Sequence, residues 1–169
     1  FIRLLGLEQG RVVEVETTAE SHVESKKILL VEDNMVNMEL AKIVLLGDGH
    51  SVIPAGNGRI ALSKLAESRP DLIFMDVQMP EMDGFTATQI IRLCEQGEND
   101  AVIEALGEEL AAQLQKTLGN KRVPIIAMTA HAMSGDKEKC LEVGMDDYIT
   151  KPINPKFISQ AIQKCFDSK

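Results

Sequence analysis

The sequence predicts an α/β domain built on a parallel, doubly wound sheet. Five short apolar runs recur between residues 26 and 152, each bounded by polar or turn residues. Runs of this kind are typical of strands that are buried on both faces. Segments in which apolar residues recur at helical spacing follow these runs. Strands that alternate with helices form a parallel sheet with helices on both faces, joined by right-handed crossovers.

The predicted sheet has a crevice where its connections change direction. Its five strands cover residues 28–31, 51–55, 71–76, 123–130 and 147–152. In the strand order 2-1-3-4-5 the connections reverse between strands 1 and 3, which opens a crevice at their carboxyl ends. Polar residues that end these two strands are therefore expected to meet.

The helices are predicted from side chains that can accept a hydrogen bond from a free helical N–H group. These positions are Asn34, Asn57, Asp83, Ser134 and Asn154, the last followed by Pro155. In the first helix, apolar residues recur at helical spacing and a glycine can end the helix. They are Val36, Leu40, Ile43 and Val44, with Gly47 at the end.

The composition fits one domain whose partners are proteins. The 169 residues are 44% apolar, and the formal charge of -8 comes with no dense run of Lys and Arg, which disfavours nucleic acid. Cys94, Cys140 and Cys165 lie far apart, so neither a disulfide framework nor a zinc site is expected, and a cytoplasmic setting fits. No apolar run reaches the roughly 18 residues that span a bilayer, so no direct membrane contact is expected. His50 is predicted to be a solvated surface residue.

Residues 1–25 lack a periodic apolar face, and we expect them to be an extension or linker from an upstream module. The alternative is an ordered extra strand, because residues 13–17 alternate between apolar and polar side chains. The chain begins with Phe1 rather than Met, so we expect it to be part of a longer protein. The main domain is predicted to cover residues 26–169.

Charged and hydroxyl side chains are predicted to gather in the crevice. Glu32 and Asp33 follow strand 1, and Asp76 ends strand 3. Three carboxylates in one crevice are costly unless a cation neutralises them, and Mg²⁺ prefers oxygen ligands from carboxylates and phosphate. Strand 4 brings the Thr129 hydroxyl to the same edge and strand 5 brings Lys151, and both can bind phosphate oxygens. The set predicts a phosphoryl-transfer site.

The motifs at these strand ends resemble those of response-regulator receiver domains, which have a flavodoxin-like fold. The segments that carry the resemblance are Val31-Glu32-Asp33-Asn34, Met75-Asp76-Val77-Gln78-Met79-Pro80, Asp83-Gly84, Thr129-Ala130 and Lys151-Pro152. The resemblance implies that Asp76 accepts a phosphoryl group from a histidine kinase or histidine phosphotransfer protein. It implies Mg²⁺ as the cofactor, held by Asp33, Asp76, the main-chain carbonyl of Gln78 and, directly or through water, Glu32. No enzymatic activity beyond self-phosphorylation and self-dephosphorylation is implied.

The resemblance also implies roles for neighbouring residues. Thr129 and Lys151 would bind the phosphoryl oxygens, and Tyr148 would be the switch aromatic; its alternative is ordinary packing at the sheet edge. Gln78 and His131 would tune the lifetime of the phosphate, although His131 could simply be exposed.

The resemblance implies an output surface and a parent protein as well. The output surface would be the helix after strand 4, strand 5 and the last helix, and the bond before Pro152 is expected to be cis. We expect a bacterial two-component protein, with this chain as the carboxyl-terminal receiver of a hybrid sensor histidine kinase. A single-domain regulator is the alternative, and dimerisation is left open.

The sequence departs from the family in a long connection between the third helix and the fourth strand. At about residues 95–121 it is predicted to contain an inserted helix that Asn99 or Asp100 caps, with one apolar stripe. The stripe consists of Ile103, Leu106, Leu110, Leu114 and Leu118. It either folds back on its own domain or forms a docking surface for another chain.

Two rivals remain for the function. A phosphatase resembling the haloacid dehalogenases also uses an aspartate nucleophile, but it needs a second Asp where this chain has Gln78. A docking module that has lost phosphate chemistry would not need Asp33, Asp76, Thr129 and Lys151 together.

Overall fold

The computed structural model describes residues 7–8, 11–12, 24–131 and 134–167. Its main sheet has five parallel strands in the order β4-β3-β5-β6-β7. The strands are β3 (Lys27–Val31), β4 (Ser51–Ala55), β5 (Leu72–Asp76), β6 (Ile125–Thr129) and β7 (Asp147–Thr150). This is the predicted order 2-1-3-4-5, so the predicted fold class is confirmed.

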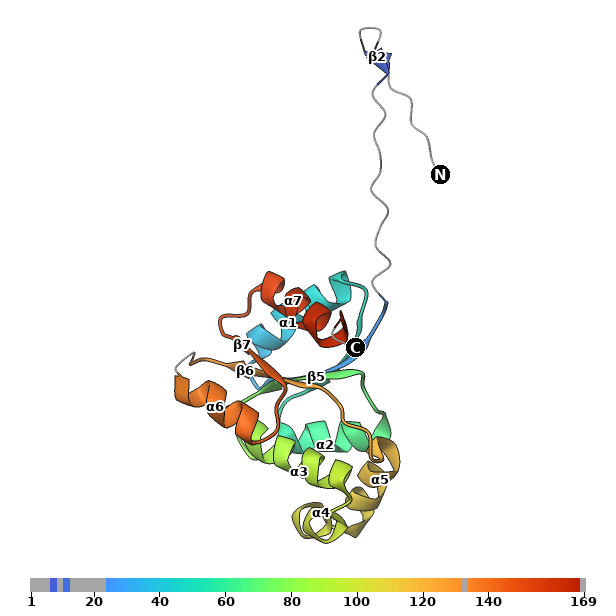
Figure 1. The fold of residues 1–169 in the computed structure, drawn as a ribbon, viewed down its shortest axis with the longest axis vertical. Helices are drawn as coiled ribbons and strands as arrows, with labels where there is room; N and C mark the ends of the chain where they lie inside the picture. Colours follow the sequence, from blue (N-terminus) through green and yellow to red (C-terminus); the bar gives the residue numbers. More distant parts are fainter. Residues whose placement is uncertain (1–6, 9–10, 13–23, 132–133, 168–169) are drawn as a thin grey trace.

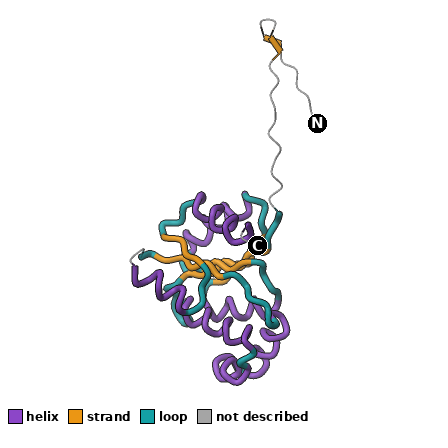
Figure 2. The backbone as a smooth tube through the Cα atoms, in the orientation of Figure 1, coloured by secondary structure: helices purple, strands orange, loops and turns teal. Residues whose placement is uncertain are grey.

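Helices form a layer on each face of the sheet (Figures 1 and 2). They are α1 (Met35–Gly47), α2 (Gly58–Glu67), α3 (Gly84–Gln96), α4 (Asn99–Leu106), α5 (Glu108–Leu118), α6 (Ser134–Glu142) and α7 (Pro155–Asp167). Successive strand residues point to opposite faces, and the strands accordingly feed two cores. Leu29 and Ile73 pack toward α2 and α3, whereas Leu30 and Phe74 pack toward α1 and α7.

Four helices, α1, α2, α3 and α7, begin where the sequence predicts, whereas α4 begins at Asn99 without the side-chain cap predicted from Asn99 or Asp100. The Asn34 side chain accepts the N–H groups of the first turn of α1, and Asn57 and Asp83 do the same for α2 and α3. At α7, Asn154 Oδ1 accepts the N–H of Lys156 at 3.0 Å. The peptide bond before Pro152 is cis, as expected.

Of the four apolar residues that predicted α1, only Val44 packs against the core, where it is half-buried. The buried side is Met38, Ala41 and Leu45. The α1 stripe, which we define as Val36, Leu40 and Ile43, is 76%, 40% and 68% exposed. α1 is therefore apolar on two sides, and one of them faces solvent.

The inserted segment forms two helices rather than one. Gly107 separates α4 from α5 with φ 85° and ψ 160°, which a helix cannot accommodate, so the single inserted helix was a wrong prediction. α5 packs on α2, where Thr117 Oγ1 donates to the Ala66 carbonyl at 2.7 Å. Arg69, which follows α2, donates a guanidinium hydrogen bond of 2.6 Å to the Leu118 carbonyl at the end of α5.

The insertion therefore folds back on its own domain. Leu106, Leu114 and Leu118, three of the five residues of the apolar stripe, are 7%, 0% and 2% exposed inside the core. They cannot also form a docking surface, which corrects that alternative. Ile103 is 37% exposed, and Leu110 is half-buried against the same core.

His50 is buried, which corrects its prediction as a surface residue. Its Nδ1 accepts the backbone N–H of Lys26 at 3.1 Å, and the Ser51 N–H donates to the Lys26 carbonyl at 2.9 Å. The turn at Gly49 (φ 87°) lies between α1 and these residues. His50 therefore helps to fasten the beginning of β3.

A buried guanidinium connects the two ends of the insertion to the strands. Arg92 of α3 donates to the Gly144 and Val123 carbonyls, each at 2.9 Å, and forms ion pairs with Glu95 at 2.8 Å and Asp146 at 3.0 Å. Glu95 in turn accepts the Val123 N–H at 2.7 Å. This network fixes the chain where it leaves α3 and where it enters β6.

Before residue 24 the structure describes only β1 (Leu7–Glu8) and β2 (Arg11–Val12), which pair antiparallel in a sheet of their own. Residues 13–17, the candidate extra strand, lie outside the described residues. The assignment of residues 1–25 to an extension stays a prediction. Within the described part of the chain, no helix has the length and hydropathy needed to cross a membrane.

Candidate functional site

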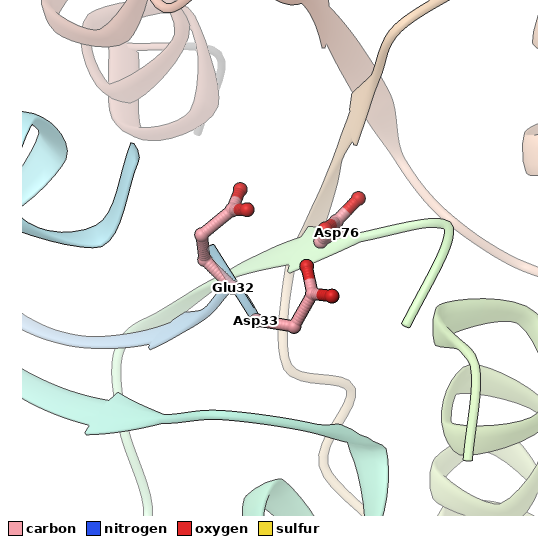
Figure 3. A group of neighbouring side chains, drawn as sticks. All are labelled: Glu32, Asp33 and Asp76. Atoms are coloured by element: carbon pink, nitrogen blue, oxygen red, sulfur yellow. The ribbon is translucent and has the colours of Figure 1, made fainter. Parts of the chain in front are cut away.

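Three carboxylates meet at the carboxyl edge of the sheet (Figure 3). Glu32 and Asp33 follow β3, and Asp76 ends the neighbouring strand β5. One carboxylate oxygen from each residue lies within 4.8 Å of the others. Glu32 and Asp76 are only 2% and 3% exposed, whereas Asp33 is exposed. The crevice thus holds three acidic groups, as predicted, and one of them faces solvent.

The Lys151 ammonium lies between two of these carboxylates. Its Nζ is 2.8 Å from Glu32 Oε2 and 2.9 Å from Asp76 Oδ2. Burial alone lowers the pKa of Lys151, but hydrogen bonds to Glu32 and Asp76 outweigh burial and the net pKa is raised. Lys151 is therefore a fixed positive charge beside Asp76.

Asp76 is less acidic than an ordinary aspartate. Its pKa is raised from 3.8 to about 6, chiefly by burial and also by the charge of Glu32, against the opposing hydrogen bond from Lys151. The Gln78 N–H donates to Asp76 Oδ1 at 3.2 Å. Apart from Lys151, the Oδ2 atom has no hydrogen-bond partner among the described residues. This buried oxygen, paired with Lys151, is the nucleophile candidate of the site.

Glycine is required where α3 begins beside the phosphoacceptor candidate. A Cβ on Gly84 would overlap the main-chain carbonyl oxygen of Asp76, and the Gly84 N–H donates to the Val77 carbonyl at 3.0 Å. The close approach holds the loop after β5 against α3. The sequence marked Asp83-Gly84 as a motif, and this contact is the physical reason for its glycine.

A groove of about 520 Å³ opens beside the carboxylates. Asp33, Gln78, Thr129 and His131 line it together with Phe85 of α3 and Lys139 of α6. The Thr129 hydroxyl exchanges hydrogen bonds of 3.2 Å with the main chain of His131. The structure therefore brings Thr129 and His131 to the same mouth as Asp33, which is the location that the sequence predicts.

Tyr148 lies in β7, half-buried against the core on the α2 and α3 face. Lys137 of α6 lies over its ring, with Nζ 5.3 Å from the centroid. These contacts fit ordinary packing at the sheet edge, and the switch role stays a prediction.

Asn37 is a site residue that the sequence reasoning missed. Its side-chain amide donates to Glu32 Oε1 at 3.3 Å, and the Asn34 N–H donates to the same oxygen at 3.2 Å. The sequence does contain a signal for Asn37. It lies three residues after the N-cap Asn34, so it sits on the same side of α1, close to the end of β3.

A family model for the response regulator receiver domain matches residues 28–103 and 100–163, most of the domain just described. The chain belongs to this family. Among curated relatives of this receiver domain, probable histidine kinase 1 of Oryza sativa subsp. indica is 43% identical over 147 residues. These cover 82% of the present chain and 15% of that protein. Hybrid signal transduction histidine kinase I of Dictyostelium discoideum is 41% identical over 81% of the chain and 7% of its own length.

Solved structures agree with the assignment. The receiver domain of sensor histidine kinase PA1611 from Pseudomonas aeruginosa PAO1, with a magnesium ion in its active site cleft, is 34% identical with a TM-score of 0.62. The match covers 83% of this chain and 96% of that one. The receiver domain of Ssk1 from Saccharomyces cerevisiae, solved with the histidine phosphotransfer protein Ypd1, is 30% identical with a TM-score of 0.69. That match covers 86% of this chain and 92% of the other.

The receiver domain spans less than a fifth of the curated relatives named above. Those relatives come from a plant and a slime mould, so they do not support the expected bacterial origin. They are histidine kinases, one of them a hybrid kinase, which is the kind of parent protein that the sequence predicts.

Proposed function

We propose that this receiver domain serves a phosphorelay by accepting a phosphoryl group on Asp76. The observation that supports this most strongly is the Asp76 Oδ2 atom, buried beside Lys151 and within reach of two further carboxylates. The donor would be a phosphohistidine on a histidine kinase or a histidine phosphotransfer protein. The output would run through α6, β7 and α7, and the chain would act in the cytoplasm as one module of a hybrid histidine kinase.

The residues present fit Mg²⁺. They offer carboxylate oxygens close together and buried oxygens that, Lys151 aside, lack partners. Asp33, Asp76 and the Gln78 carbonyl would hold the ion, with Glu32 at its edge. When bound, it would supply positive charge to the phosphoryl oxygens and lower the pKa of Asp76.

The transfer conserves charge and bonds as follows. An Asp76 carboxylate oxygen attacks phosphorus in line with the P–N bond, a P–O bond forms, and the electron pair of the P–N bond returns to the imidazole nitrogen. Lys151 and the Thr129 hydroxyl bind the phosphoryl oxygens. Hydrolysis removes the phosphoryl group again: water attacks phosphorus, the P–O bond to Asp76 breaks, and inorganic phosphate leaves the restored carboxylate.

The primary test is intact mass after incubation with acetyl phosphate and Mg²⁺. The wild type is expected to gain one phosphoryl group, and Asp76→Asn is expected to gain none. Asp33→Asn should need far more Mg²⁺ for the same yield. An unmodified wild type would favour the phosphate-independent docking module, whereas continuous release of phosphate from phosphomonoesters would favour the phosphatase.

A protein donor is also supported by the exposed α1 stripe. α1 begins two residues after Asp33, and its 13 residues extend about 20 Å from the site. Val36 of the stripe and its neighbour Met35 are both more than 70% exposed at the end nearest the carboxylates. A donor that brings its histidine to Asp76 must cover this end, and an apolar helix face on the donor would bury the stripe.

Transfer from a protein can be separated from transfer from a small molecule. Ile43→Asp should slow transfer from phosphorylated Ypd1 by roughly tenfold or more, because it puts a charge in the buried centre of the contact. Leu141→Asp is the matched control, since Leu141 is an exposed apolar residue of α6. Phosphorylation by acetyl phosphate should be the same in both. Equal transfer from Ypd1 to the two variants would remove α1 as the docking surface.

A further inference from the structure

The Glu32 carboxylate is occupied by protein donors on both oxygens. Oε1 accepts the Asn34 N–H and the Asn37 side-chain amide at 3.2 and 3.3 Å, and Oε2 lies 2.8 Å from Lys151 Nζ. Asp33 differs, because it is exposed and no described residue donates a hydrogen bond to its carboxylate. Glu32 therefore has three protein donors, Asp76 has the Gln78 N–H and Lys151, and Asp33 has none among the described residues.

The donors already bound to Glu32 separate it from Asp33 as a metal ligand. Together the three carboxylates and Lys151 leave a net negative charge that one divalent cation balances without a direct bond to Glu32. A cation that also recruited Glu32 would have to displace the ammonium from a buried oxygen. Breaking a buried ion pair is costly because it leaves a buried charge unpaired.

We propose that Glu32 is a positioning residue that holds Lys151 over the phosphoacceptor, and that Asn37 orients Glu32 for this role. The inference rests on the proposed function. In the resting site Lys151 has two partners. When Asp76 becomes an acyl phosphate, its carboxyl group is neutral and its hold on Lys151 weakens. The Glu32 pair then keeps the ammonium at the place where the phosphoryl oxygens arrive.

Glu32 and Lys151 then act as a unit, which a double-mutant cycle can detect. We would measure the rate of phosphorylation by acetyl phosphate at saturating Mg²⁺ for Glu32→Gln, Lys151→Ala and the double variant. Affinity for beryllofluoride, followed by NMR, gives a second measurement where the rate is slow. Glu32→Gln keeps the size of the side chain and removes its charge. Glu39→Gln, at an exposed position of α1, controls for net charge.

Glu32→Gln should lower the rate roughly 10- to 100-fold in the wild-type background, as loss of an orienting partner does elsewhere. In the Lys151→Ala background it should change the rate less than about twofold, because the group it positions is gone. Asn37→Ala should show the same dependence on Lys151 with a smaller effect. The Mg²⁺ dissociation constant should rise much less in Glu32→Gln than in Asp33→Asn.

Two results would overturn the inference while leaving the proposed function intact. One is a Glu32→Gln effect of the same size with and without Lys151. The other is a loss of Mg²⁺ affinity in Glu32→Gln as large as in Asp33→Asn, which would make Glu32 a metal ligand in its own right. A wild type that forms no phosphoryl adduct would instead refute the proposed function, and the positioning role with it.

Discussion

The raised pKa of Asp76 predicts that this residue destabilises the folded domain at neutral pH. Its pKa is 3.8 for the ordinary group and about 6 in the fold. Each unit of pKa corresponds to about 1.4 kcal/mol, so ionising Asp76 costs the folded state about 3 kcal/mol. Below 3.8 the group is protonated in both states and costs nothing. As the pH rises past 6, the folded state carries the charge and the full cost is present.

Asp76→Asn removes the charge and should therefore stabilise the metal-free domain. In urea unfolding with EDTA, the variant should be more stable than the wild type by less than about 1 kcal/mol at about pH 4 and by about 3 kcal/mol at about pH 8. Mg²⁺ should close the gap, because it binds the folded wild type and raises its stability by mass action. Asp100→Asn, at an exposed position of α4, is the control for the loss of one negative charge. If the free energy of unfolding changed with pH in the same way for the wild type and Asp76→Asn, the destabilising charge would not be that of Asp76.

Three further predictions concern packing and buried charge in the domain. Leu114→Ala should lower the free energy of unfolding by about 3 kcal/mol and Ile103→Ala by less than about 1 kcal/mol, since only the first empties a buried space. Gly84→Ala should cost at least about 1 kcal/mol in urea unfolding and slow phosphorylation, because its Cβ displaces the Asp76 main chain. Arg92→Met should cost about 3 kcal/mol, since it leaves the buried Glu95 carboxylate without its ion-pair partner, and thermal unfolding would detect it.

The sheet and the positions of the site residues could be predicted because the information is local. A fully apolar run such as residues 72–75 has one low-energy environment, the centre of a sheet covered on both sides. The residue that ends such a strand must emerge at the carboxyl edge. Glu32, Asp76, Thr129 and Lys151 were placed correctly for this reason, with no knowledge of their contacts.

Features that depend on distant residues could not be predicted in the same way. Arg92 looks like a surface residue of an amphipathic helix until Gly144 and Asp146, more than 50 positions away, surround it. The break at Gly107 was also missed, because the apolar spacing on its two sides continues as though the helix were unbroken. A glycine at φ 85° ends a helix, yet glycine alone does not say which conformation the tertiary fold selects.

The first helix shows where periodicity stops being decisive. Met38, Ala41 and Leu45 recur at helical spacing just as the α1 stripe does, so each set on its own predicts the helix and neither predicts which side is buried. The difference lies in what each side meets. The side of α1 with Met38, Ala41 and Leu45 packs on β3, β4 and α7. The α1 stripe lies on another side and is exposed to solvent. Exposed apolar side chains lower the solubility of an isolated domain, and Val36 places one end of the stripe beside the carboxylates of the candidate site. This arrangement is the physical argument that a partner covers the stripe.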